Sequence, residues 1–276
     1  MKLRETFAPI AEVPSDLIRR LLQRVSEPLF FVGLHHPGDA ENFRIACLSV
    51  NTLWTRKKPI LRVRALIDSG AYTIIHKHGH YPESHSVENY ARRLFTLYTG
   101  GIVSILAAVA QDYMCEPHIR AKTGLSTEQH QRLTVERYDA LKVELERLFE
   151  GPIPFHLMPV LQGQTPEDYV RHIEMYGDRL TRGMWVGVGS VCKRQGNVKS
   201  ITSVLLAIKT ARPDLQLHGF GVKLTALADK LVRKLLRTAD SMAWSYAAFK
   251  QGRGRDANDW REARCFCAKV AVADLV

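Results

Sequence analysis

The stretch Leu66-Ile67-Asp68-Ser69-Gly70-Ala71-Tyr72 decides how the rest of this 276-residue sequence is interpreted. An apolar run that begins at Val63 enters it, and a carboxylate followed by Ser-Gly ends that run. The pattern is typical of a buried strand that delivers an acid to the rim of a sheet, with a glycine that lets the backbone turn close to a ligand. Because many strands end in turn residues, the prediction depends on whether other strands end in the same way.

Seven further apolar runs alternate with helical patterns along the chain. Together with the first, the candidate strands are residues 28–33, 44–50, 63–68, 102–112, 155–162, 184–189, 215–221 and 238–244. Helices are predicted at residues 86–98, 126–150, 165–179, 197–211 and 224–237. Strands that are apolar on both faces and alternate with helices indicate a parallel sheet covered by helices.

Eight such units predict an α/β fold of the (β/α)8 TIM barrel type, with a doubly wound open sheet as the alternative. No repeat, low-complexity tract or linker divides the sequence. We therefore expect residues 1–276 to form one barrel domain, with a helical, basic C-terminal extension at about residues 246–276.

The net charge of +11 is concentrated in the last third of the chain. Residues 182–276 hold 17 Lys and Arg against 7 Asp and Glu, whereas residues 1–181 hold 22 against 21. A one-sided basic surface favours a nucleic acid as partner, and a solvated face that aids solubility is the alternative. The candidate phosphate-binding residues are Lys193, Arg194, Lys223, Arg253 and Arg255.

Composition also bears on where the protein works. No apolar run is long enough to span a membrane, and the N-terminus lacks the apolar core of a signal peptide. The five cysteines are few and odd in number, which is typical of reduced thiols. We therefore expect a cytoplasmic protein without membrane contact.

In a barrel the active site lies at the C-terminal ends of the strands, and six predicted strands end here in chemically useful residues. These ends are Asp68-Ser69-Gly70, Gln111-Asp112-Tyr113, Gln162-Gly163-Gln164, Gly189-Ser190, Gly219-Phe220-Gly221 and Asp240-Ser241. Asp and Gln together can read the edge of a purine, and Tyr72, Tyr113 or Trp244 can stack on its ring. A second carboxylate can attack an anomeric carbon and form a covalent glycosyl intermediate.

These motifs resemble, in the same order from about residue 44 to 245, those of the tRNA-guanine transglycosylase superfamily. The likeness is strongest to its DNA-modifying branch, the deazapurine DNA modification proteins, which insert 7-deazaguanine bases into DNA. The matching segments are Asp68-Ser69-Gly70-Ala71-Tyr72-Thr73 with Asp-Ser-Gly-Gly-Phe-Gln, Asp112-Tyr113-Met114-Cys115-Glu116-Pro117 with Asp-Glu-Cys-Thr-Pro, Val160-Leu161-Gln162-Gly163 with Val-Gln-Gly-Gly, Val186-Gly187-Val188-Gly189 with a Gly-Gly strand, His218-Gly219-Phe220-Gly221-Val222 with Leu-Met-Gly-Val-Gly, and Ala239-Asp240-Ser241-Met242 with the start of Val-Asp-Met-Phe-Asp.

The resemblance implies a (β/α)8 barrel and a set of roles for these residues. Asp68 is expected to be a catalytic acid and base, and Asn51 matches an asparagine that the superfamily places beside that aspartate. The base-reading residues implied are Asp112 and Gln162, with the backbone of Gly163 and Gly189.

The superfamily's nucleophile is the second aspartate of Asp-x-x-Asp, and that position is Ala243 in this sequence. Asp240, at the first position, is the favoured nucleophile through a shifted strand end. Attack by Asp68 and the absence of a covalent intermediate are the alternatives.

The superfamily's structural zinc site has a Cys-x-Cys-x-x-Cys run followed by a distant histidine. Cys265 and Cys267 supply the first pair, but position 270 is Val and neither Cys nor His follows it. Tetrahedral zinc needs four ligands, so zinc is not expected unless residues elsewhere complete the site. A second cluster is interpreted as a histidine-rich surface loop rather than a metal or phosphate site, and consists of His76, His78, His80 and His85.

The function implied is exchange of guanine in DNA for a 7-deazaguanine by glycosyl transfer, with DNA and the free base as partners. One alternative is the same exchange on tRNA, and another is an N-glycosidase in which water completes the reaction. A third is a catalytically inactive module that binds a base or nucleic acid, which Ala243 favours.

Overall fold

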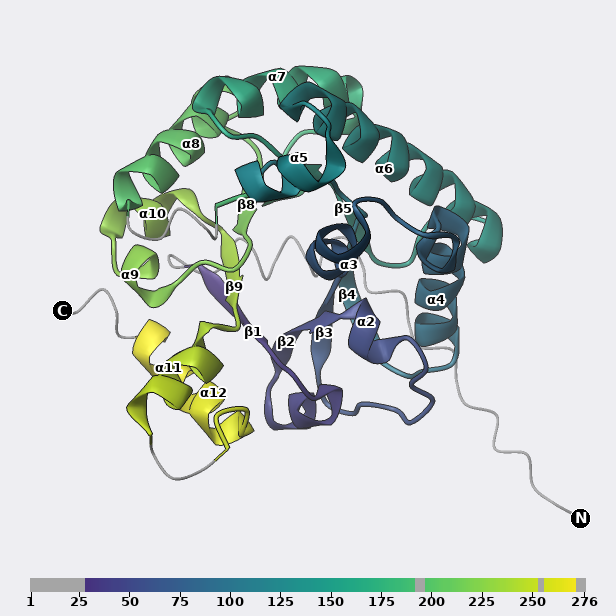
Figure 1. The fold of residues 1–276 in the computed structure, drawn as a ribbon. Helices are drawn as coiled ribbons and strands as arrows, with labels where there is room; N and C mark the ends of the chain where they lie inside the picture. Colours follow the sequence, from purple (N-terminus) through teal and green to yellow (C-terminus); the bar gives the residue numbers. More distant parts are fainter. Residues whose placement is uncertain (1–27, 192–196, 253–255, 272–276) are drawn as a thin grey trace, which may run out of the picture.

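The computed structural model describes residues 28–191, 197–252 and 256–271. In this part of the chain nine parallel strands form one sheet, in the order β5-β4-β3-β2-β1-β9-β8-β7-β6, and helices surround it (Figure 1). The strands are β1 (Leu29–Gly33), β2 (Ile45–Ser49), β3 (Arg64–Asp68), β4 (Ser104–Val109), β5 (His156–Met158), β6 (Val160–Leu161), β7 (Trp185–Val188), β8 (Gln216–Gly219) and β9 (Thr238–Ser241). The sheet is a nearly closed barrel, so the TIM-barrel prediction is confirmed and the doubly wound alternative is wrong.

The two ends of the sheet come together at the fifth predicted strand, which is present as two short strands on either side of Pro159. β5 pairs with β4, and β6 pairs with β7. Proline has no N–H to give to a ladder, which accounts for the break. The Pro159 carbonyl still accepts the Gly187 N–H at 2.8 Å, so the two ends of the sheet meet on one segment of chain.

The helices that surround the barrel follow the predicted positions closely. They are α4 (Val87–Thr99), α6 (Thr127–Phe149), α7 (Pro166–Tyr176), α8 (Val198–Ala211), α9 (Leu224–Leu227) and α10 (Lys230–Leu235). α6 begins with a capping box, in which Ser126 and Gln129 each accept the other's backbone N–H. The predicted helix 224–237 is instead two helices, because the Asp229 carboxylate accepts the N–H groups of Leu231 and Val232, both at 2.9 Å, and starts a new helix there.

Short helical segments lie in the connections between the strands and the longer helices. These are η1 (Pro37–Asn42), α2 (Val50–Leu53), α3 (Ala71–His78), η2 (Glu83–His85), α5 (Pro117–Thr123) and η3 (Gly177–Arg179). α3 and α5 lie in front of the strands in Figure 1, over the end of the barrel where the candidate site was predicted.

Each strand is buried on both faces, which accounts for the continuous apolar runs in the sequence. Within β3, Leu66 packs inside the barrel, whereas Ala65 and Ile67 pack outward against the helices. The interior cluster includes Phe31, Met158 and Trp185. These side chains pack the inside of the barrel below the C-terminal ends of the strands.

The C-terminal segment forms two helices against the barrel, α11 (Ala243–Gln251) and α12 (Trp260–Ala271). The predicted eighth strand ends at Ser241 rather than at 244, because α11 begins at Ala243. Phe266 of α12 packs on Phe30 of β1, with ring centroids 5.9 Å apart. Among the described residues there is no helix with the length and apolarity that crossing a membrane requires.

Candidate active site

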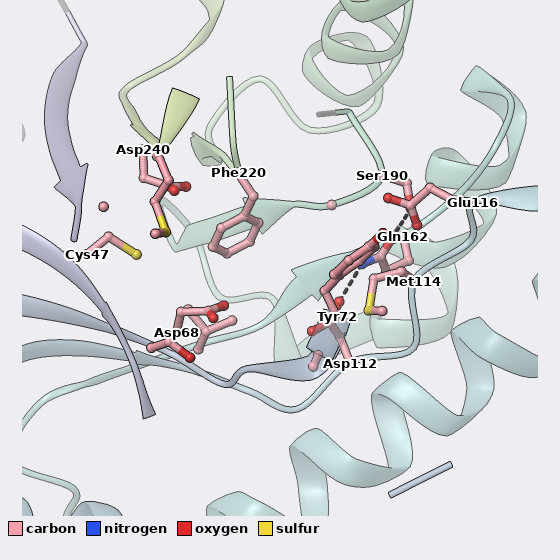
Figure 2. Close-up of a pocket in the computed structure, with 16 residues that line it drawn as sticks. Cys47, Asp68, Tyr72, Asp112, Met114, Glu116, Gln162, Ser190, Phe220 and Asp240 are labelled. Atoms are coloured by element: carbon pink, nitrogen blue, oxygen red, sulfur yellow. Dashed lines mark hydrogen bonds between the residues drawn. The ribbon is translucent and has the colours of Figure 1, made fainter. Parts of the chain in front are cut away.

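A cavity of about 290 Å³ opens at the C-terminal ends of the strands (Figure 2). Six of the eight residues predicted as catalytic or base-binding line it, namely Asp68, Tyr72, Asp112, Gln162, Gly189 and Asp240. In Figure 2, Asp68 and Asp240 lie toward one side of the cavity, and Asp112 and Gln162 lie toward the other. The rim motifs of the sequence therefore converge on one space.

The turn after β3 fixes the position of Asp68. Its Oδ2 accepts the Gly70 N–H at 3.0 Å, and Gly70 has a φ of 70°, in the left-handed region that favours glycine. Asn51 Nδ2 donates to the Gly70 carbonyl at 3.3 Å. A Cβ at Gly70 would lie 2.2 Å from Asn51 Nδ2, so the Asp-Ser-Gly turn requires glycine for conformation and for space.

Asp68 is held in a state suited to proton transfer. Burial raises its pKa to about 6, the Asp240 carboxylate adds to this, and the N–H groups of Gly70 and Ser69 oppose it. A carboxyl group whose pKa is near neutral can both give and accept a proton at physiological pH. The Cys47 thiol lies in the same wall, and burial, Asp240 and Asp68 all raise its pKa, so it remains a neutral thiol beside the two carboxyl groups.

A buried chain of hydrogen bonds orients Asp240. Its Oδ1 accepts the Gly221 N–H at 3.1 Å and lies 3.2 Å from His218 Nε2. His218 Nδ1 lies 2.8 Å from the Thr238 hydroxyl, which also accepts the Trp185 Nε1–H at 2.8 Å. A neutral imidazole that donates its Nε2–H to Asp240 has Nδ1 free to accept, and in that tautomer the Thr238 hydroxyl donates to His218 while it accepts from the indole.

A second chain of hydrogen bonds connects Asp112 to Glu116 (Figure 2). Gln162 Nε2 donates to Asp112 Oδ2, and Gln162 Oε1 lies 2.7 Å from the Ser190 hydroxyl. Ser190 Oγ also lies 3.0 Å from Glu116 Oε2 and accepts the Cys115 N–H at 2.9 Å. The carboxamide of Gln162 is therefore fixed at both ends, with its plane set by Asp112 and Ser190.

Asp112 is buried, and burial raises its pKa to about 7 although the Gln162 hydrogen bond opposes the shift. The folded protein therefore holds this proton more tightly than the unfolded chain, where the pKa is near 3.8. Between these two values the free energy of unfolding falls as pH rises, by up to about 1.4 kcal/mol per pH unit.

We therefore expect Asp112→Asn to stabilise the protein above pH 7, because asparagine has no proton to lose there. The gain should shrink toward pH 4, where Asp112 of the natural protein is protonated in the folded state and increasingly protonated in the unfolded state. Urea unfolding at pH 4.5, 6 and 8 measures it, with Asp139→Asn as the control, since Asp139 is exposed and pairs with Arg179 at 2.6 Å. Equal stability of Asp112→Asn and the natural protein at pH 8 would contradict this prediction.

Side chains from α6 and α7 hold the backbone of Gln162 through hydrogen bonds. Its N–H donates to His172 Nδ1 at 2.8 Å, and its carbonyl accepts from Gln131 Nε2 at 2.7 Å. His172 Nε2 then donates to the Gln131 carbonyl at 3.1 Å. Burial lowers the pKa of His172 to about 3, so the ring is neutral and its Nδ1 is available as an acceptor.

Gly189 makes room for the Gln162 side chain, and the base-reading role predicted for its backbone stays a prediction. Its N–H donates to Leu161 at 2.9 Å, and its carbonyl accepts the Tyr169 hydroxyl at 2.7 Å. A Cβ at this position would lie 2.1 Å from Gln162 Nε2. Only glycine leaves the Gln162 side chain where Asp112 and Ser190 hold it.

The Gly189→Ala variant should therefore lose most activity while it keeps its fold. The added methyl group displaces the Gln162 carboxamide, and a shift of about 1 Å in a positioning group costs on the order of a hundred-fold in rate. Steady-state kinetics measure this effect. Gly38→Ala is the matched control, because a Cβ at Gly38 meets nothing within 4 Å. Equal rates of the two variants would contradict the role assigned to Gly189.

Two predicted base-binding residues do not line the cavity. Trp244 is buried at the start of α11 and donates its Nε1–H to the Gly33 carbonyl at 2.7 Å, so its ring cannot stack on a base there. A Cβ at Gly163 would lie 2.7 Å from Asp168 Cβ, which places this glycine against α7. Phe220 supplies an aromatic side chain to the cavity wall instead. Its ring packs over Gly187, where an added Cβ would lie only 2.3 Å from Phe220 Cε2.

Several lining residues were not predicted as site residues, namely Cys47, Glu116, Ser190 and Phe220. The last three lie within or directly after strand-end segments that contain predicted residues, so their neighbours carried a signal. Cys47 has no such signal, because it occurs within an apolar run of β2. His218 was also missed, since its role depends on a contact with Asp240 from the adjacent strand.

Of the predicted phosphate-binding residues, Lys193, Arg194, Arg253 and Arg255 lie outside the described residues. Lys223 is half-buried at the N-terminus of α9, two residues after Gly221.

The predicted cysteine pair does not fit a shared zinc ion. Cys265 and Cys267 are two residues apart on α12, and side chains at that spacing point to different sides of a helix. Cys265 is exposed, whereas Cys267 is half-buried against the core. Over residues 28–191, 197–252 and 256–271, no group of three or more His, Cys, Asp or Glu side chains is arranged to hold a metal ion.

The histidines of the predicted cluster make separate ring contacts. His85 stacks on Trp54 with centroids 4.7 Å apart, and His76 stacks on Tyr72 at 5.5 Å. His78 and His80 are neighbours at 6.4 Å.

Comparison with known proteins bears on what this cavity does. No curated protein matches the chain. A family model described as DpdA, DeoxyPurine in DNA protein A, matches residues 30–270, which include every strand of the barrel except the first residue of β1, and the whole cavity. The chain therefore belongs to the DpdA family.

Proposed function

We propose that the protein exchanges guanine in DNA for a 7-deazaguanine derivative by glycosyl transfer. The observation that carries the proposal is the placement of two carboxyl groups, Asp68 and Asp240, in one base-sized cavity with Asp112 and Gln162. Membership of the DpdA family implies a role in deazapurine modification of DNA, and this favours DNA over tRNA as the polymer. The basic excess in the last third of the chain suits either nucleic acid.

Asp240 is the proposed nucleophile. One carboxylate oxygen, Oδ1, is occupied by the Gly221 N–H and by His218, which leaves the other oxygen to attack C1′ of the target nucleotide. The Asp240–C1′ bond forms as the bond from C1′ to N9 of guanine breaks.

Asp68 is the proposed acid and base. With a pKa of about 6 it can protonate the departing guanine and then accept the proton from N9 of the incoming deazaguanine. The nitrogen of the new base attacks C1′, and the bond to Asp240 breaks. Each proton and electron pair is returned, so the cycle needs no cofactor.

Asp112 and Gln162 are proposed to read the base. Guanine presents two N–H donors and a carbonyl on one edge, and a carboxyl group with a carboxamide complements that edge. A 7-deazaguanine has the same edge and differs only in its five-membered ring. One pocket can therefore bind the base that leaves and the base that enters, with Phe220 or Tyr72 against the ring face.

Incorporation of labelled 7-deazaguanine separates DNA from tRNA. The full-length protein is incubated with the labelled base and with either duplex DNA or tRNA, and the nucleosides are then analysed by mass spectrometry. We expect the label in DNA and a rate at least tenfold lower in tRNA. Incorporation into tRNA alone would assign the protein to the RNA-modifying reaction, and incorporation into neither would refute the proposed transfer.

A further inference from the structure

The surface beside the cavity carries exposed apolar side chains on the helix that follows Asp240. Met242 lines the cavity and is 40% exposed, whereas Tyr246 and Phe249 on α11 are 60% and 73% exposed. Met242 is the residue that caps α11, and Tyr246, Phe249 and Lys250 occupy positions i, i+3 and i+4 on one face of the helix. We call Met242, Tyr246, Phe249 and Lys250 the α11 stripe.

The helix that carries the α11 stripe is packed firmly against the barrel. On the opposite face of the helix, Trp244 and Ala248 are buried, and the Trp244 indole donates to the Gly33 carbonyl. The Ser245 hydroxyl lies 2.9 Å from His35 Nε2, which adds a second link to the loop after β1. The exposed rings are thus presented to solvent by a helix that is anchored to the barrel.

The chemistry of the α11 stripe combines aromatic rings with positive charge. Lys250 Nζ lies 5.0 Å from the centre of the Tyr246 ring. Surfaces that bind single-stranded nucleic acid combine aromatic side chains, on which bases stack, with cations that follow the phosphates. The stripe runs from the cavity wall for about 12 Å along the helix, which is room for a short run of nucleotides.

We propose that the α11 stripe binds the unpaired nucleotides next to the target base, with bases stacked on Tyr246 and Phe249 and a phosphate near Lys250. This inference rests on the proposed function, since a base that reacts at Asp240 must leave its stack and leave its neighbours exposed. The bound substrate is therefore single-stranded or locally opened DNA rather than an intact duplex. Tyr246 and Phe249 tolerate any base, because every base has a flat face.

The test is equilibrium binding of a fluorescein-labelled single-stranded DNA of 12 nucleotides to the full-length protein. Loss of two stacking contacts at about 1–3 kcal/mol each predicts that the double variant Tyr246→Ala/Phe249→Ala binds at least tenfold more weakly. The aromatic exchange Tyr246→Phe/Phe249→Tyr should bind within about twofold of the natural protein. Val143→Ala is the matched surface control, because Val143 is 65% exposed on α6 and lies outside the stripe.

Binding of the double alanine variant within twofold of the natural protein would overturn the inference. So would loss of self-association in that variant without loss of DNA binding, which would assign the stripe to contacts between copies. The assay requires no base exchange, so the two proposals fail separately. If the double alanine variant binds DNA more weakly but the natural protein transfers no base, the DNA-binding role of the stripe stands and the proposed transfer is refuted. If the variant binds DNA as well as the natural protein and the natural protein exchanges bases, only the role of the stripe is refuted.

Discussion

Asp240→Asn should lower the rate of base exchange by about a thousand-fold or more, because a carboxamide cannot attack C1′ as a carboxylate does. The substitution keeps the size of the side chain and an oxygen that can accept from His218 and from the Gly221 N–H. The site is therefore expected to keep its geometry and its affinity for DNA. Initial rates of deazaguanine incorporation, measured together with DNA affinity, separate lost chemistry from lost binding.

The control for this substitution is Asp214→Asn, which removes a carboxylate paired with Arg212 at 2.8 Å, outside the cavity lining. It should exchange bases at close to the natural rate. A protein–DNA adduct trapped by denaturation should be present in the natural protein and absent in Asp240→Asn. If Asp240→Asn retains the adduct and Asp68→Asn loses it, the attacking carboxylate is Asp68, the alternative that the sequence left open.

Asp68→Asn should lower the exchange rate by about 10²–10⁴-fold, the range for loss of a general acid and base. It should also change the pH dependence. Release of guanine requires the protonated form of Asp68, and its pKa is about 6, so this half-reaction should slow as pH rises above 6 in the natural protein. The variant has no such group, and its residual release rate should lack that fall.

Single-turnover guanine release between pH 5 and 8, without acceptor base, measures the half-reaction. Retention in Asp68→Asn of the same decrease above pH 6 would show that another group donates the proton. Asp112 is the neighbour to compare, because its pKa is about 7 and it lies in the same cavity. Asp112→Asn should mainly weaken base binding, with the pH profile of release retained.

The sequence predicts the barrel well because each strand repeats the same signal. An apolar run of limited length, buried on both faces, is followed by a polar or glycine-rich end, and this local pattern needs no knowledge of partners. The strand end at Ser241 is the exception that matters. The prediction extended the strand to residue 244, but α11 begins at Ala243 and moves Trp244 into the core.

The sequence indicates which carboxyl groups belong to the candidate site, but it does not indicate the hydrogen bonds that position them. The reason is physical. Asp68 and Asp112 are signalled by position at a strand end. The contact of His218 with Asp240 joins residues 22 apart in sequence, and that of Gln162 with Asp112 joins residues 50 apart. These contacts depend on how neighbouring strand ends are placed around the barrel, which periodicity does not encode. The steric role of Gly189 likewise becomes visible only with the side chain of Gln162 in place.

The central claim is that one cavity replaces a base without leaving an abasic site, and the stoichiometry of a single reaction tests it most directly. Duplex DNA with labelled guanine is incubated with the protein and unlabelled 7-deazaguanine, and released guanine, incorporated deazaguanine and abasic sites are counted in the same sample. Glycosyl transfer through Asp240 predicts one guanine released for each deazaguanine incorporated and no abasic sites. Guanine release that continues without acceptor base and leaves abasic sites would contradict the claim and assign the cavity to a hydrolase.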